Sequence, residues 1–184
     1  MTTPRFRTAS LLGAMAAFLW VSNAWAGDAA LQEDAARAMQ RGERLIQDGH
    51  YKQAAVELER ASDLAGGPCP DCLLGVGRAY SGAGQYDAAL QVTRMALALY
   101  SSPEDQAKAY DQLGTLLAIK GDMNGAREAY GKAVQLDGRM AVQVRASLAQ
   151  ALIKRASLDT AKSAQSAAAA IAQGVAATVA GPQR

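Results

Sequence analysis

Small and apolar residues recur along the chain at two nested spacings. Within each of three segments they fall three or four positions apart, which is typical of helices that bury one face. The segments themselves recur at intervals of 35 and 37 residues, at Gly42–Ala61, Val76–Ala96 and Leu113–Ala133. A period of this length predicts stacked helix pairs.

Two glycines in each segment indicate how a helix pair is built. Gly49, Gly84 and Gly121 fall between the two helices, where a left-handed glycine ends a helix without a Cβ penalty. A second glycine lies within the first helix, where it costs up to about 1 kcal/mol against alanine. Because this cost recurs at one register, we predict the close approach of a neighbouring helix that carries a matching alanine. These packing positions are Gly42, Ala54, Gly77, Ala89, Gly114 and Ala126.

The repeated segments resemble the tetratricopeptide repeat (TPR), in which a Leu-Gly pair is followed by an aromatic residue, an alanine, an aromatic residue and another alanine. The second and third copies match best, while the first has Arg41 where leucine is usual. The resemblance implies an all-α fold, a right-handed α-solenoid of about three helix pairs plus a C-terminal capping helix. We expect a domain over 27–160, with units at about 35–68, 70–103 and 107–140.

The remaining C-terminal sequence predicts further helix. Residues 141–160 have apolar spacing suited to the capping helix or to a degenerate fourth unit, and a stacked array needs a terminal helix with a polar outer face. The tail, 161–184, is rich in alanine, serine and glutamine. It predicts a loose helix with a frayed end, with disorder as the alternative.

Residues 1–26 have the features of a secretory signal peptide. Arg5 and Arg7 form a positive front, residues 9–21 are apolar, and Ala24-Trp25-Ala26 supplies the small-x-small cleavage pattern. The alternative is an uncleaved anchor, but thirteen residues fall short of the roughly 20 that span a bilayer. We therefore expect cleavage after Ala26 and a periplasmic or secreted protein, without an integral membrane span after cleavage.

Composition and charge exclude some classes of protein. Cleavage would leave 17 basic and 17 acidic residues, and six tyrosines as the only aromatic residues. This balance gives no basic face for nucleic acid. Alanine, with 42 of 184 residues, favours helix. Two cysteines are too few for a disulfide-dense mini-scaffold.

The sequence Cys69-Pro70-Asp71-Cys72 lies between the first and second units. In an oxidising compartment we expect a Cys69–Cys72 disulfide. One interpretation is a structural disulfide that holds the loop, called a staple below. The other is a thiol-disulfide exchanger, in which a helix N-terminus lowers the pKa of a cysteine. We favour the staple, because the βαβ pattern of a thioredoxin-like context is absent. Zinc would need two more ligands.

Catalytic chemistry has little support in the sequence. His50, the single histidine, falls in a predicted surface turn and has no nucleophile or metal partner in the pattern. No nucleophile–base set can be argued. We therefore expect no enzyme activity, no cofactor and no metal.

The TPR resemblance also implies a function, since the first helices of such units line a concave groove that binds peptides or proteins. We therefore expect an exported scaffold for a protein or peptide partner, which supports assembly of a periplasmic or envelope complex. The alternative is a redox accessory protein that uses the cysteine pair. The positions that match groove-lining places are Met39, Glu43, Ile46, Leu74, Arg78, Lys108, Asp111 and Thr115.

Overall fold

The computed structural model describes the backbone of residues 12–67 and 69–179 and the side chains of residues 30–67 and 69–170. Within these residues the secondary structure is helical, so the predicted all-α fold is confirmed. The elements are α1 (Leu12–Gln47), α2 (Tyr51–Leu64), α3 (Pro70–Gly82), α4 (Tyr86–Leu99), α5 (Pro103–Lys120), α6 (Met123–Leu136), the 3-10 turn η1 (Gly138–Met140) and α7 (Ala141–Val179).

The predicted signal segment, residues 1–26, begins outside the described residues. From Leu12 onward its backbone belongs to α1, which is continuous with the first helix of the first pair. The side chains at the expected cleavage site, Ala24 to Ala26, lie outside the described part. The secretory signal therefore stays a prediction from sequence.

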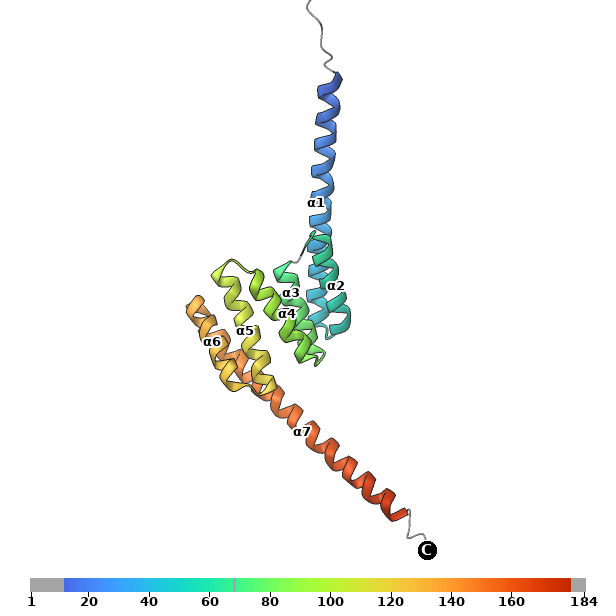
Figure 1. Cartoon of the computed structure of the whole chain (residues 1–184), viewed down its shortest axis with the longest axis vertical. Helices are drawn as coiled ribbons and strands as arrows, with labels where there is room; N and C mark the ends of the chain where they lie inside the picture. The colour runs from blue at the N-terminus through green and yellow to red at the C-terminus, as the bar shows by residue number, and fades with distance from the viewer. Residues whose placement is uncertain (1–11, 68, 180–184) are drawn as a thin grey trace, which may run out of the picture.

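The helices stack as successive pairs (Figure 1). Helix α1 packs on α2, α3 on α4 and α5 on α6, while the contacts α2–α3 and α4–α5 join one pair to the next. Helix α7 packs chiefly on α5 at the end of the stack. The arrangement is the α-solenoid of three helix pairs with a C-terminal capping helix that the sequence predicted.

The predicted turn glycines adopt the left-handed conformation. The φ angles of Gly49, Gly84 and Gly121 are 78°, 79° and 94°. A fourth glycine, Gly66, has a φ of 78° after α2. Since side chains with a Cβ are strained there, glycine allows each helix to end and the chain to reverse.

Two of the recurring helix glycines, Gly42 and Gly114, lie against a side chain on the second helix of their pair. A Cβ on Gly42 would lie 2.5 Å from Leu58 Cγ, and one on Gly114 would lie 2.7 Å from Tyr130 Cδ1. The neighbour is therefore the side chain four residues after the predicted alanine. Ala54 is fully buried, and its carbonyl oxygen would lie 3.3 Å from the Gly42 Cβ.

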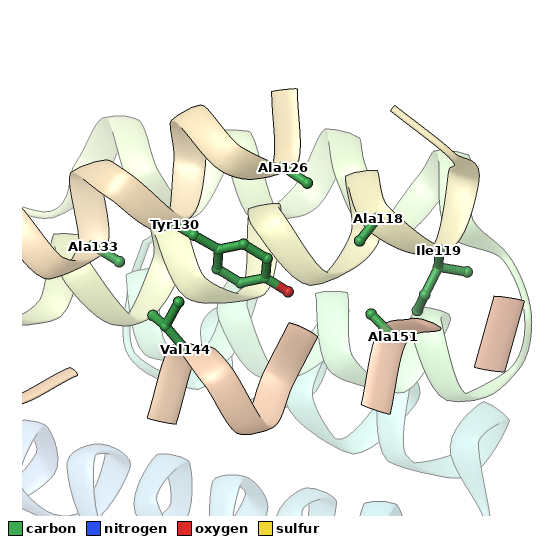
Figure 2. Packing of buried hydrophobic residues seen from close by; sticks show 7 residues of the cluster. All are labelled: Ala118, Ile119, Ala126, Tyr130, Ala133, Val144 and Ala151. Carbon is green, nitrogen blue, oxygen red and sulfur yellow. The ribbon is translucent and has the colours of Figure 1, made fainter. Parts of the chain in front are cut away.

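The core consists mainly of alanine, which lets helices approach closely. Tyr130 is one of the few large side chains in it and is 5% exposed. Figure 2 shows its ring among small side chains from α6, α5 and α7. This cluster joins the last pair to the capping helix through Ala118, Ile119, Ala126, Tyr130, Ala133, Val144 and Ala151.

Some of the approximate unit boundaries, at residues 35, 107 and 160, fall inside helices. Helix α5 begins at Pro103, because Ser102 Oγ accepts a hydrogen bond of 3.3 Å from the backbone N–H of Asp105; position 107 is already helical. Helix α7 continues past residue 160 to Val179 without a break. No second helix follows α7 within the described residues.

Candidate partner-binding groove

One large cavity lies between the first helices of successive pairs. Its volume is about 620 Å³, and most of its residues come from α3 and α5, with α1 and α7 at its two ends. Its lining residues are Met39, Asp71, Leu74, Arg78, Ser81, Lys108, Asp111, Gln112, Thr115, Leu116, Met140 and Gln143.

Most predicted groove residues line this cavity. Met39, Leu74, Arg78, Lys108, Asp111 and Thr115 all do so. Glu43 is next to it through an ion pair with Arg78. Ile46 lies elsewhere, packed against a buried cluster that contains Ala54 and Ala79. Ile46 therefore packs within the first two pairs and does not line this cavity.

The sequence reasoning missed several lining residues, although the repeat contained the signal for two of them. Ser81 lies 35 positions after Ile46, and Asp71 lies 37 positions before Lys108, so both are repeat equivalents of predicted positions. Met140 and Gln143 come from η1 and α7. Only the stacking of α7 on α5 brings them to the cavity.

The cationic side chains of the cavity are already paired within the chain. Arg78 forms an ion pair with Glu43 across the first two pairs. Lys108 Nζ donates to Asp105 Oδ1 at 2.8 Å, which lowers the pKa of that carboxyl. Both pairs are partly exposed, so each contributes modest stability and can exchange for a partner's charges.

Asp111 is the least satisfied polar group in the cavity wall. Its Oδ2 accepts a hydrogen bond of 3.0 Å from Ser147 Oγ on α7, while its Oδ1 is buried with no hydrogen-bond partner in the chain. Burial raises the pKa of this carboxyl, and the hydrogen bond from Ser147 opposes that shift. A donor from a bound partner would satisfy Oδ1.

A buried polar contact fixes the floor of the cavity. Gln112 Nε2 donates to Thr93 Oγ1 at 3.0 Å and to the Leu74 carbonyl at 3.2 Å. Thr93 is fully buried. Gln112 therefore ties α5 to both α3 and α4 and holds the second and third pairs in one relative position.

The cysteine pair lies at the beginning of α3. The sulfur atoms of Cys69 and Cys72 are at bonding distance, with their Cα atoms 5.2 Å apart. Cys69 is the N-cap of α3, and its Sγ accepts a hydrogen bond of 3.1 Å from the Cys72 N–H. The predicted disulfide is supported by this geometry.

The described part of the chain has few side chains suited to metal binding or catalysis. Its side chains include no group of three or more histidine, cysteine, aspartate or glutamate residues that could hold a metal ion. His50 is an exposed N-cap residue whose Nδ1 lies 3.1 Å from the Asp48 carbonyl. The helices that the structure describes include none with the length and hydropathy of a membrane span.

The stacked helix pairs and the cavity along their first helices define a class: an α-helical repeat protein of the kind that serves protein–protein interaction. Residues 107–139 match the family described as Tetratricopeptide repeat. This match and the stacked helix pairs support a tetratricopeptide repeat protein. Repeats of this family are typically non-catalytic. No curated protein matches the chain.

Proposed function

We propose that this protein is an exported scaffold that binds a protein or peptide partner in the cavity between α1, α3, α5 and α7. The observation that carries the proposal is the cavity itself, because its apolar side chains alternate with polar groups that a partner can engage. Leu74, Leu116 and the methionines Met39 and Met140 offer apolar contact. This mixture suits an amphipathic or extended segment of a partner protein.

Two features support the location and role of the scaffold. The positive front, the short apolar stretch and the Ala24-Trp25-Ala26 pattern favour export. The disulfide between Cys69 and Cys72 suits an oxidising compartment. An exported scaffold of this kind would support assembly of a periplasmic or envelope complex.

Charge reversal in the cavity tests the proposal. Arg78→Glu and Lys108→Glu exchange exposed cavity charges, and Arg127→Glu on α6 is the matched control because it is exposed and does not line the cavity. Proteins captured from cell extract by the wild-type chain are compared with those captured by each variant. We expect at least one protein that the wild-type chain and Arg127→Glu both capture and that neither cavity variant captures. Equal capture by all four chains contradicts the proposal.

A thiol-disulfide exchanger is the second candidate function. One observation favours it: Cys69 is partly buried at a helix N-terminus, while Cys72 behind it is 2% exposed. The helix N-terminus and the Cys72 N–H would stabilise a Cys69 thiolate after reduction. The reduction potential separates the two roles, since structural bridges fall below about −300 mV and strong oxidants reach about −120 mV.

A further inference from the structure

Both cations that line the cavity have a carboxylate partner within the chain. Arg78 forms an ion pair with Glu43, and Lys108 forms one with Asp105. Each pair uses one hydrogen bond, while arginine and lysine side chains have further N–H donors. The positive charges of the cavity are therefore compensated within the chain, and spare donors remain for the backbone carbonyl oxygens of a bound segment.

The two carboxylates that line the cavity are less well compensated. Asp71 accepts a hydrogen bond from the hydroxyl of Tyr100, and Asp111 accepts one from the hydroxyl of Ser147. Neither carboxylate forms an ion pair within the part of the chain that the structure describes. The cavity wall therefore has an excess of negative charge, which a cation from a partner would complement.

Of these two carboxylates, Asp111 has the less favourable surroundings. The pKa of Lys108 is raised chiefly by its hydrogen bond to Asp105 and also by the charge of Asp71, so Asp71 has a cation in its neighbourhood. The pKa of Asp111 is set by neutral surroundings: burial raises it, and hydrogen bonding from Ser147 and Gln143 lowers it. No cation contributes to the pKa of Asp111.

The charge of Asp111 is a cost that the free chain does not need. Its Oδ1 is buried without a hydrogen-bond partner among the described residues. A neutral asparagine would keep an acceptor for Ser147 and would remove the buried charge. Groups that lower stability where a simpler residue would serve are typical of functional positions. The position therefore indicates that binding supplies what the free chain lacks.

Apolar side chains at the two ends of the cavity indicate what flanks the cation. Met39 on α1 lies at one end, and Met140, which precedes α7, lies at the other. Both are partly exposed, and methionine adapts its shape to apolar partners. Asp111 on α5 lies between these ends. Across the stack the cavity is thus apolar, then acidic, then apolar.

We propose that the partner segment inserts a lysine or arginine side chain into the cavity, where it donates to Asp111 Oδ1, with apolar residues of the segment on either side. This inference rests on the proposed function and specifies the chemistry of the partner. A basic side chain compensates the buried charge as well as the missing hydrogen bond, whereas a neutral donor supplies only the bond. Gln143 is exposed and lies beside the carboxylate, so its side chain turns aside to admit the donor.

A library of short random peptides displayed on phage supplies the probes. Peptides are selected on the immobilised full-length chain, and the affinity of each synthetic peptide is measured by fluorescence anisotropy. We expect the selected peptides to share a lysine or arginine between apolar residues. They should bind Asp111→Asn more than about tenfold more weakly than the wild-type chain. Asp48→Asn is the matched control and should bind as the wild-type chain does, because Asp48 is exposed and does not line the cavity.

A double-mutant cycle tests whether the peptide's cation and Asp111 interact. Replacing the basic residue of the peptide by glutamine should weaken binding to the wild-type chain by a similar factor. The same replacement should have little effect on binding to Asp111→Asn. Because this variant loses a buried charge, its melting temperature should not fall, and unfolding cannot then explain weaker binding. Independent effects of the two changes overturn the proposal.

The charge reversals in the cavity separate this inference from the proposed function. Some peptides that Arg78→Glu and Lys108→Glu fail to bind could lack a basic residue, or could bind Asp111→Asn as tightly as the wild-type chain. Such a result for the selected peptides as a group overturns the cation and leaves the cavity as the binding site. Peptides that bind both reversal variants normally, or a selection that yields none, contradict binding in the cavity and overturn this inference with it.

Discussion

The hydroxyl of Tyr100 donates a hydrogen bond of 2.6 Å to the carboxylate of Asp71. Tyr100 is the residue that follows α4, and Asp71 lies between the two cysteines at the beginning of α3. The bond therefore holds the end of the second pair against the disulfide loop. Since Asp71 also lines the cavity, the contact positions one wall of the candidate site.

Removing this hydroxyl should change alkaline stability. The pKa of Tyr100 lies well above its usual value, because the ring is buried and because the hydroxyl donates to Asp71. Folding thus favours the protonated form; the resulting stability is fully present below about pH 10 and is lost as pH rises through the folded pKa. Tyr100→Phe should lower the free energy of unfolding by about 1 kcal/mol at pH 7. Above pH 10 this free energy should decline less steeply in the variant than in the wild-type chain.

Urea unfolding of both chains from pH 7 to pH 11 measures this effect. Part of the decline should remain in the variant, because burial also raises the pKa of Tyr130. Parallel declines in the two chains would show that Tyr100 is not coupled to folding in this way.

Gly114→Leu should destabilise the third pair. A Cβ at this position already meets the ring of Tyr130, so overpacking should cost about 1–3 kcal/mol. Gly131→Leu on α6 is the matched control, because a Cβ there has no heavy atom within 4 Å. We expect the melting temperature to fall for the first variant and to hold or rise for the second. Equal shifts would mean that the close approach is not the cause.

Asp111→Asn should stabilise the chain at neutral pH. Burial raises the pKa of this carboxyl, so the folded state favours its protonated form and stability falls as pH rises through the region just above its usual value of about 4. The introduced amide removes the buried charge and keeps an acceptor for Ser147. We expect a gain of about 1 kcal/mol or less at pH 7 and none at pH 3. A lower melting temperature at pH 7 contradicts this expectation.

Loss of the disulfide should have a small effect on stability. The ring between Cys69 and Cys72 is short, so its removal should cost about 2 kcal/mol or less in the chain-entropy model. Replacing both cysteines by Ser should therefore leave a folded chain with modestly weaker partner binding. Mild reduction of the wild-type chain provides the control without a substitution. Two free thiols in freshly isolated protein would exclude the staple, and loss of all activity on a partner by a normally folded variant would favour exchange.

Export should remove both tryptophans. If cleavage follows Ala26, the mature chain begins at Gly27 and lacks Trp20 and Trp25. Its emission spectrum should then be that of tyrosine alone, and N-terminal sequencing of the exported protein should begin at Gly27. A chain that begins at Met1 contradicts the signal-peptide assignment.

The sequence by itself determined the helix pairs and their turns. Gly49, Gly84 and Gly121 marked the ends of first helices, because a left-handed turn after a helix strongly favours glycine. The recurring Gly42, Gly77 and Gly114 marked close approach. The glycine turn is a local requirement, and the close approach of two helices is a requirement of every pair. The repeated sequence therefore shows each of them several times. Six of the twelve cavity residues followed from the same register.

Only the tertiary structure decided the long-range contacts and the exposure of α7. Tyr100 meets Asp71 across 29 residues, a distance in sequence that no local pattern encodes. Ile46 belongs to a packed cluster instead of the cavity because the stacking of α1, α2 and α3 surrounds it. The alanine-rich sequence predicted a helix after residue 141, but alanine fits buried and exposed positions equally well. The packing of α7 on α5 alone determines which strip is buried and which one faces outward.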